Sequence, residues 1–146
     1  MRLVAIETCG RCPAMAEPAE VTKVSLYRML GGEAALRQLT RRMYELMATL
    51  PEAKAARSIH PADLANSEQK FFEFMSGWLG GPPLFEQRHG APMLRRRHFV
   101  AQIGAAEVEA WLLCFERAMD ETVSEPRLRD ALREPIRRLA HHMQNS

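Results

Sequence analysis

One histidine, His98, stands directly after three arginines and between apolar residues, in the segment MLRRRHFV at residues 93–100. An imidazole in an apolar setting can coordinate a metal or a cofactor iron, whereas a run of arginines can bind the phosphates of nucleic acid. If the segment is helical, successive arginines point about 100° apart, while Leu94 and His98, four residues apart, share one face. The spacing favours a histidine that enters an apolar site, with guanidinium groups near its rim that meet an anion.

Large side chains with one polar tip stand elsewhere in the chain and match such a site. Tyr44 and Trp111 each carry one hydrogen-bonding group on an apolar body, and such groups need a partner when they are buried. Flat apolar walls and one cation come from a single predicted helix, which carries Lys70, Phe71, Phe74 and Met75. An apolar slot with one histidine, cationic edges and a few donors suits haem, whose propionates are anionic. An ordinary helical core explains the same residues, so their spacing alone predicts a helical domain with a candidate cofactor pocket.

The elements that must position these residues are helices. Apolar residues repeat at steps of three and four along most of the chain, and strand signals are nearly absent. This pattern predicts an all-α protein of about six helices. We expect a short helix capped by Ser25, helices at about 33–49, 65–79, 105–121 and 125–143, and a short helical segment that ends near His98. Residues 84–92 are expected to form a loop, and Pro135 is expected to kink or split the last helix.

Length and charge limit the classes of function. The 146 residues suffice for one domain with a core, and a net charge of only +2 argues against a dedicated nucleic-acid binder. No apolar run approaches the roughly 18 residues needed to cross a bilayer, and the N-terminus lacks the apolar core of a signal peptide. We therefore expect a cytoplasmic protein with neither a membrane nor a nucleic acid as its partner.

The first residues differ in composition from the rest. Residues 1–23 are expected to form a flexible leader, and residues 24–146 the folded domain. The leader contains Cys9 and Cys12 in the sequence CGRC. A CxxC pair serves a zinc or redox site only with further ligands or a strand and helix around it, so we favour a solvated tail.

Five stretches of the chain together resemble the group II truncated haemoglobins, over roughly residues 24–144. They read LYRMLGGEAALRQLTRRMYELM, HPADL, FFEFMSGWLGGPP, QRHGAPMLRRRHFV and IGAAEVEAWLLCFERAMDE. The GWLGGPP block, the arginine run that ends in His98, and the AWLLC block that follows are specific in their order and spacing. The resemblance implies a shortened globin, a two-over-two helical sandwich around haem b.

The resemblance also implies roles for single residues. His98 would be the proximal iron ligand, and Tyr44 and Trp111 would donate hydrogen bonds to a ligand on the opposite, distal side. The remaining distal residues would be His60 as a third donor, Ser67 as a small residue that leaves the pocket open, and Phe71 as a wall. The residues expected to hold the cofactor are Lys70, Phe74, Leu94 and Arg97, with Lys70 paired to a propionate. The family's proline after the ligand is absent from FVAQ here, so the following loop is expected to differ.

The donors determine the expected activity. Two or three hydrogen bonds to partly negative O2 in a dry pocket contribute about 1 kcal/mol or more each, and about 1.4 kcal/mol slows release tenfold. We expect a globin that binds O2, NO, CO or peroxide, with NO dioxygenase or peroxidase activity as candidates and an unidentified reductase as partner. The alternative is a haem-based gas or redox sensor or interaction module. Either a monomer or a homodimer is compatible with the sequence.

Overall fold

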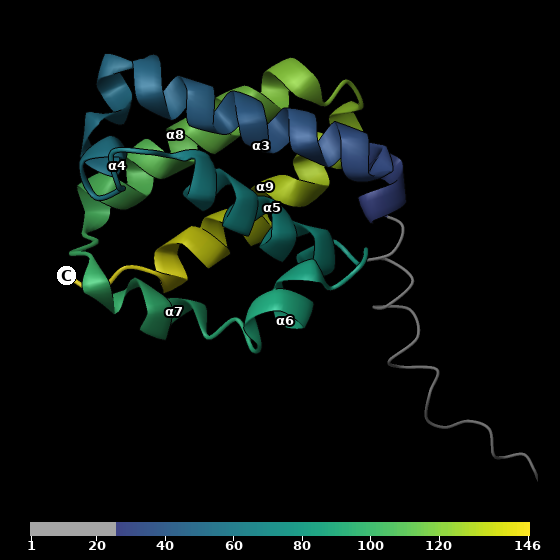
Figure 1. Ribbon diagram of the computed structural model, residues 1–146. Helices are drawn as coiled ribbons and strands as arrows, with labels where there is room; N and C mark the ends of the chain where they lie inside the picture. Colours follow the sequence, from purple (N-terminus) through teal and green to yellow (C-terminus); the bar gives the residue numbers. More distant parts are fainter. Residues whose placement is uncertain (1–25) are drawn as a thin grey trace, which may run out of the picture.

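The computed structural model describes residues 26–146, so the predicted leader with Cys9 and Cys12 and the Ser25 cap lie outside the described residues. Figure 1 shows that the described part consists of helices and connecting loops, which confirms the all-α prediction for it. The long helices are α3 (Gly32–Thr49), α5 (Ala65–Trp78), α8 (Ala105–Thr122) and α9 (Pro126–His142). The short ones are η1 (Pro51–Ala53), α4 (Lys54–Ser58), α6 (Leu84–His89), α7 (Leu94–Arg97) and η2 (His98–Val100). Within residues 26–146, none of the helices is long and apolar enough to cross a membrane.

The long helices begin and end close to the predicted residues because glycine and proline mark their ends. Gly31 and Gly32 have φ angles of 120° and 75°, which side chains disfavour; Gly31 separates a helical turn at residues 26–30 from α3, and Gly32 is the first residue of α3. Pro126 is the first residue of α9, where its missing N–H has no intrahelical partner to lose.

One expectation about local structure was wrong, and of the two alternatives expected at Pro135 the split does not occur. The predicted loop at 84–92 contains α6, which at six residues is too short to show a helical repeat in the sequence. Helix α9 continues through Pro135 and is not split there. Buried residues before and after Pro135, namely Leu128, Leu132 and Ile136, hold both halves of α9 in the core.

The core lies where the four long helices meet. Helix α3 packs against α5 and α8, and α8 packs also against α9 (Figure 1). The fully buried apolar residues at these contacts include Leu36, Leu39, Met43, Phe72, Met75, Leu112, Phe115, Met119, Leu128, Leu132 and Ile136. Burying one such side chain contributes about 2 kcal/mol, which makes these contacts the main source of stability.

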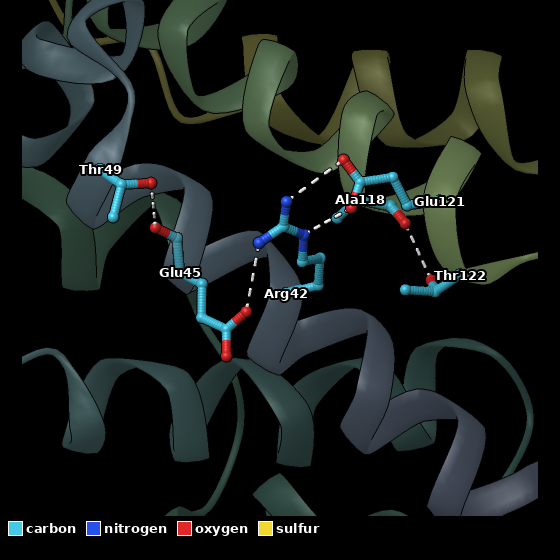
Figure 2. Close-up of polar contacts among 6 residues, drawn as sticks. All are labelled: Arg42, Glu45, Thr49, Ala118, Glu121 and Thr122. Carbon is cyan, nitrogen blue, oxygen red and sulfur yellow. Dashed lines mark hydrogen bonds and ion pairs between the residues drawn. The ribbon is translucent and has the colours of Figure 1, made fainter.

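A surface ion pair connects α3 with α8. Figure 2 shows Arg42 of α3 between Glu45 of the same helix and Glu121 of α8, with Arg42 Nε 2.5 Å from Glu121 Oε1. The hydrogen bond to Arg42 lowers the pKa of Glu121. Because water screens exposed charges, this pair adds little to the free energy of the buried α3–α8 contact beneath it.

The first described turn packs against the end of α5. The backbone N–H of Tyr27 donates to the carbonyl oxygen of Leu79 over 3.2 Å. A Cβ atom at Gly81 would lie 2.5 Å from Cδ1 of Tyr27, which is closer than two carbon atoms can approach. The Tyr27 ring can therefore lie against the backbone only where position 81 has no side chain.

One buried carboxylate joins α5 to α6. The Glu73 side chain is 1% exposed and lies 2.8 Å from Gln69 Nε2, 2.9 Å from His89 Nε2 and 3.2 Å from Arg88 Nη1. Burial alone would raise the pKa of Glu73, but the hydrogen bonds from Gln69 and His89 and the charge of Arg88 outweigh it, so the pKa is lowered. The folded state therefore favours the ionised carboxylate.

Replacing Glu73 by glutamine is expected to lower the free energy of unfolding at neutral pH by about 2 kcal/mol, because charge-assisted hydrogen bonds are lost. A carboxylate with a lowered folded-state pKa stabilises fully above its unfolded pKa, and this stabilisation is lost as the pH falls through the folded value. The substitution should therefore also weaken the fall in stability on acidification. Urea unfolding followed by circular dichroism at several pH values measures both effects. The matched control is Glu86→Gln, on the exposed side of α6, and equal behaviour of the two variants would contradict the assignment.

Candidate haem site

The predicted metal ligand, His98, is the first residue of η2 and follows directly on α7. Its Nδ1 lies 2.7 Å from the carbonyl oxygen of Leu94, one turn earlier, so Nδ1 carries the proton. Nε2 then keeps its lone pair and has no partner among the described residues. Leu94 is half-buried against the core, as predicted. The His98 side chain is exposed, although we expected it to enter an apolar site. A fixed imidazole with a free Nε2 is the arrangement that a metal-binding histidine needs.

The predicted distal residues lie together in one aromatic cluster. The Tyr44 ring on α3 contacts His60 edge-on at 5.9 Å and Phe71 at 6.3 Å between ring centroids. Phe71 on α5 contacts Trp111 edge-on at 5.5 Å, and Trp111 on α8 stacks on Phe115 at 5.8 Å. Residues that are 67 positions apart in the sequence (44 to 111) are thus joined through Phe71.

Two polar tips in this cluster lack partners. The Tyr44 side chain is buried, and within residues 26–146 neither its hydroxyl nor the indole N–H of Trp111 has a hydrogen-bond partner. Burial raises the pKa of Tyr44 well above its usual value, and the charges of Glu68 and Cys114 act in the same direction. Tyr44 therefore keeps its proton at physiological pH and remains a donor.

His60 offers an acceptor to the same cluster. Its Nδ1 lies 2.7 Å from the carbonyl oxygen of Ala56 and so carries the proton, which leaves Nε2 as an acceptor in the neutral ring. Burial lowers the pKa of His60, the hydrogen bond to Ala56 opposes this, and the charges of Arg57 and His98 lower the pKa further.

The remaining predicted residues of α5 are spread around its first turns. Ser67 is half-buried and lies one turn before Phe71, on the same face. Lys70 is exposed and forms no ion pair with any other described residue, so its ammonium group is available to an anion. Phe74 turns toward α6, where it contacts Phe85 edge-on at 6.4 Å between centroids and lines a cavity of about 180 Å³.

Arg97 contacts the backbone of the preceding loop. Its Nη2 lies 3.0 Å from the carbonyl oxygen of His89 and 3.1 Å from that of Ala91, and its guanidinium lies over the Phe85 ring. These contacts attach α7 to α6. Lys70 and Arg97 are the two cations predicted to hold the cofactor. Arg97 is bonded to the backbone, whereas Lys70 has no ion-pair partner among the described residues and is free to bind a propionate.

Two residues that support the site were not among the predicted ones. Glu73 is a carboxylate inside the apolar stretch FFEFM, and this placement is itself a signal of a buried ionic network. Asn145 hydrogen-bonds to the loop after His98, and nothing in the sequence marks a residue so close to the chain end.

The donor set of this structure fits haem. Among the described residues, Nε2 of His98 has no partner on the α7 side, and neither have the two donors in the aromatic cluster on the side of α3, α5 and α8. Haem is a flat apolar group whose iron takes one axial imidazole and whose other axial ligand can be a small molecule with a partial negative charge. Leaving a buried hydroxyl without a partner costs about 1–3 kcal/mol, and a small polar ligand beside Tyr44 would remove that cost.

Comparison with known proteins agrees with the geometry. The family model described as bacterial-like globin matches residues 25–145. The chain is 40% identical over 114 residues to the group 2 truncated hemoglobin YjbI of Bacillus subtilis, covering 78% of this chain and 84% of that protein.

Solved structures resemble the described fold. The group II 2-on-2 hemoglobin from Agrobacterium tumefaciens is 61% identical, with a TM-score of 0.81, over 82% of this chain and 93% of that one. The truncated oxygen-avid haemoglobin from Bacillus subtilis is 38% identical, with a TM-score of 0.75, over 82% of this chain and 98% of that one. The chain therefore belongs to the bacterial-like globin family and within it to the group II truncated haemoglobins, two-over-two helical proteins that bind haem and oxygen.

Proposed function

We propose that this chain holds haem b through Nε2 of His98 and holds O2 tightly with Tyr44 and Trp111, for reaction with NO or for peroxide chemistry and not for O2 delivery. The observation that carries the proposal is the pair of unpartnered donors on either side of Phe71. When bound, haem supplies the iron at which O2, NO, CO or peroxide is taken up. Lys70 would hold a propionate, and Leu94 and Phe74 would give apolar contact to the ring.

Tyr44 and Trp111 act by being in position before the ligand arrives. Their rings are held by packing on three different helices, so their donors need little reorganisation to meet negative charge on O2. Each donor in a site of this kind is expected to contribute about 1 kcal/mol or more. The haemoglobin from Bacillus subtilis is described as oxygen-avid, which supports tight O2 binding by this chain as well.

His60 acts as an acceptor in this proposal, in place of the third donor that the sequence suggested. A neutral imidazole whose Nδ1–H donates to the carbonyl oxygen of Ala56 can take a proton from peroxide at Nε2. The His60 ring lies edge-on to the Tyr44 ring, so a donor and a base come from neighbouring rings.

Turnover with NO requires an electron donor. Forming one nitrate ion from O2 and NO consumes one electron, which an electron donor would have to supply for each turnover. We therefore propose an unidentified reductase as partner of a cytoplasmic protein that is a monomer or a homodimer.

Replacing His98 by alanine tests the ligand assignment. We expect the wild-type protein to show a Soret band that shifts on reduction and again with CO, and the variant to lose this spectrum and regain it with added imidazole. His141→Ala, at the exposed end of α9, is the control and should behave like wild type. A His98→Ala protein with an unchanged spectrum would refute the assignment.

Removing either distal donor should speed O2 release. Trp111→Phe and Tyr44→Phe are each expected to raise the O2 dissociation rate about tenfold, because one hydrogen bond to the ligand is lost. Stopped-flow mixing with CO measures this rate. Tyr27→Phe, which removes the hydroxyl of the other tyrosine, is the matched control. Wild-type rates in both distal variants would contradict the proposed role of the donors.

Replacing His60 by leucine should slow the reaction with hydrogen peroxide by about a hundredfold, since a general base is lost, and should change CO binding far less. Stopped-flow absorbance records both rates on the same protein. Equal slowing of both reactions would instead indicate a packing role for His60.

A further inference from the structure

The end of the chain returns to the segment that carries His98. Figure 1 shows the C-terminus beside the connection from α7 to α8, although α9 begins on the far side of the molecule. After α9 ends at His142, the last residues run alongside the loop 101–104. This loop joins η2, which contains His98, to α8, which contains Trp111.

Asn145 makes four hydrogen bonds, three to this loop and one to His98. Its backbone N–H donates to the carbonyl oxygen of Ile103 over 2.8 Å, and its Oδ1 accepts from the N–H of Ile103 over 2.9 Å. Its Nδ2 donates to the carbonyl oxygens of Ala101 at 3.0 Å and of His98 at 3.3 Å. Both backbone groups of buried Ile103 and the carbonyl group of His98 are thus bonded to one residue.

An amide side chain is required for this arrangement. It must accept one hydrogen bond and donate two at the same time, which among short side chains only asparagine can do. An aspartate would keep the bond from the Ile103 N–H but would direct negative oxygen at two carbonyl oxygens. The neighbouring Ser146 accepts a side-chain bond from Gln102 and makes no side-chain contact with His98 or Ala101 among the described residues.

We propose that Asn145 is a positioning residue for the proximal ligand, which acts on the iron through His98. The imidazole is fixed to Leu94 on the N-terminal side, and Asn145 holds the backbone of His98 on the C-terminal side. Together these bonds set the orientation of Nε2 and how firmly haem is retained. The inference rests on the proposed role of His98.

The test uses the full chain loaded with haem and compares wild type with Asn145→Ala, Asn145→Asp and the control Ser146→Ala. The first measurement is the rate of haem transfer to excess apomyoglobin. The second is the iron–histidine stretching band of the ferrous, ligand-free protein in resonance Raman spectra. We expect Asn145→Ala to lose haem about tenfold faster and to shift or broaden the band. Asn145→Asp should do so at least as strongly, and Ser146→Ala should match wild type.

Several outcomes would overturn the proposal. If Asn145→Ala and Asn145→Asp match Ser146→Ala in both measurements, Asn145 does not position His98. If only the melting temperature falls, while haem loss and the Raman band of the folded protein stay unchanged, the residue is purely structural. If Asn145→Ala does not fold, the same readings on Asn145→Asp decide. A wild-type protein without an iron–histidine band would fail the proposed ligand role itself, and the inference with it.

Discussion

The hydrogen bond from Nδ1 of His98 to the Leu94 carbonyl oxygen decides which ring nitrogen can serve as a ligand. A neutral imidazole has one N–H and one lone pair, and this bond assigns the lone pair to Nε2. Helix α7 is only four residues long and cannot fix such a residue by packing alone. It is held from outside instead, by Arg97 toward α6 and by Asn145 toward the end of the chain. The proposed proximal side thus depends on polar contacts made at both ends of one helical turn.

The proposed distal side depends on packing. Three long helices bring Tyr44, Phe71 and Trp111 into ring contact, and this packing leaves two donors without partners among the residues that the structure describes. The free-energy cost of leaving these donors without partners is small compared with the stabilisation that the surrounding buried core provides. A buried hydroxyl with a strongly raised pKa keeps its proton and can donate it, which under the proposed function favours ligands that accept hydrogen bonds. The same burial that makes the cluster rigid therefore gives it chemical selectivity.

The sequence predicted those parts that depend on repeated spacing. The long helices were predictable from apolar residues at steps of three and four, and from glycine and proline at their ends. Helix α6 was not, because six residues between Pro83 and Gly90 give no repeat to detect. The continuity of α9 through Pro135 depends on tertiary packing that no local rule contains.

The residues of the site also divide into those that the sequence predicts and those that it does not. The ring cluster could be expected from residue types and from resemblance to a family. The acceptor role of His60 and the backbone contacts of Arg97 could not, because each depends on where one carbonyl group points. Asn145 is the extreme case, since its partners lie more than forty positions away, at residues 98–103.

Gly81 limits which substitutions this chain tolerates. The block GGPP resembles a simple helix terminator, for which several small or polar residues would serve equally well. Yet the second glycine receives the ring of Tyr27, and even one methyl group there would collide with it. Position 81 therefore couples the helical turn at residues 26–30 to the end of α5. A chimera that takes the turn at residues 26–30 from a relative would also have to take the residue at position 81 from that relative. Tyr27 and Gly81 must be exchanged together, although they lie far apart in the sequence.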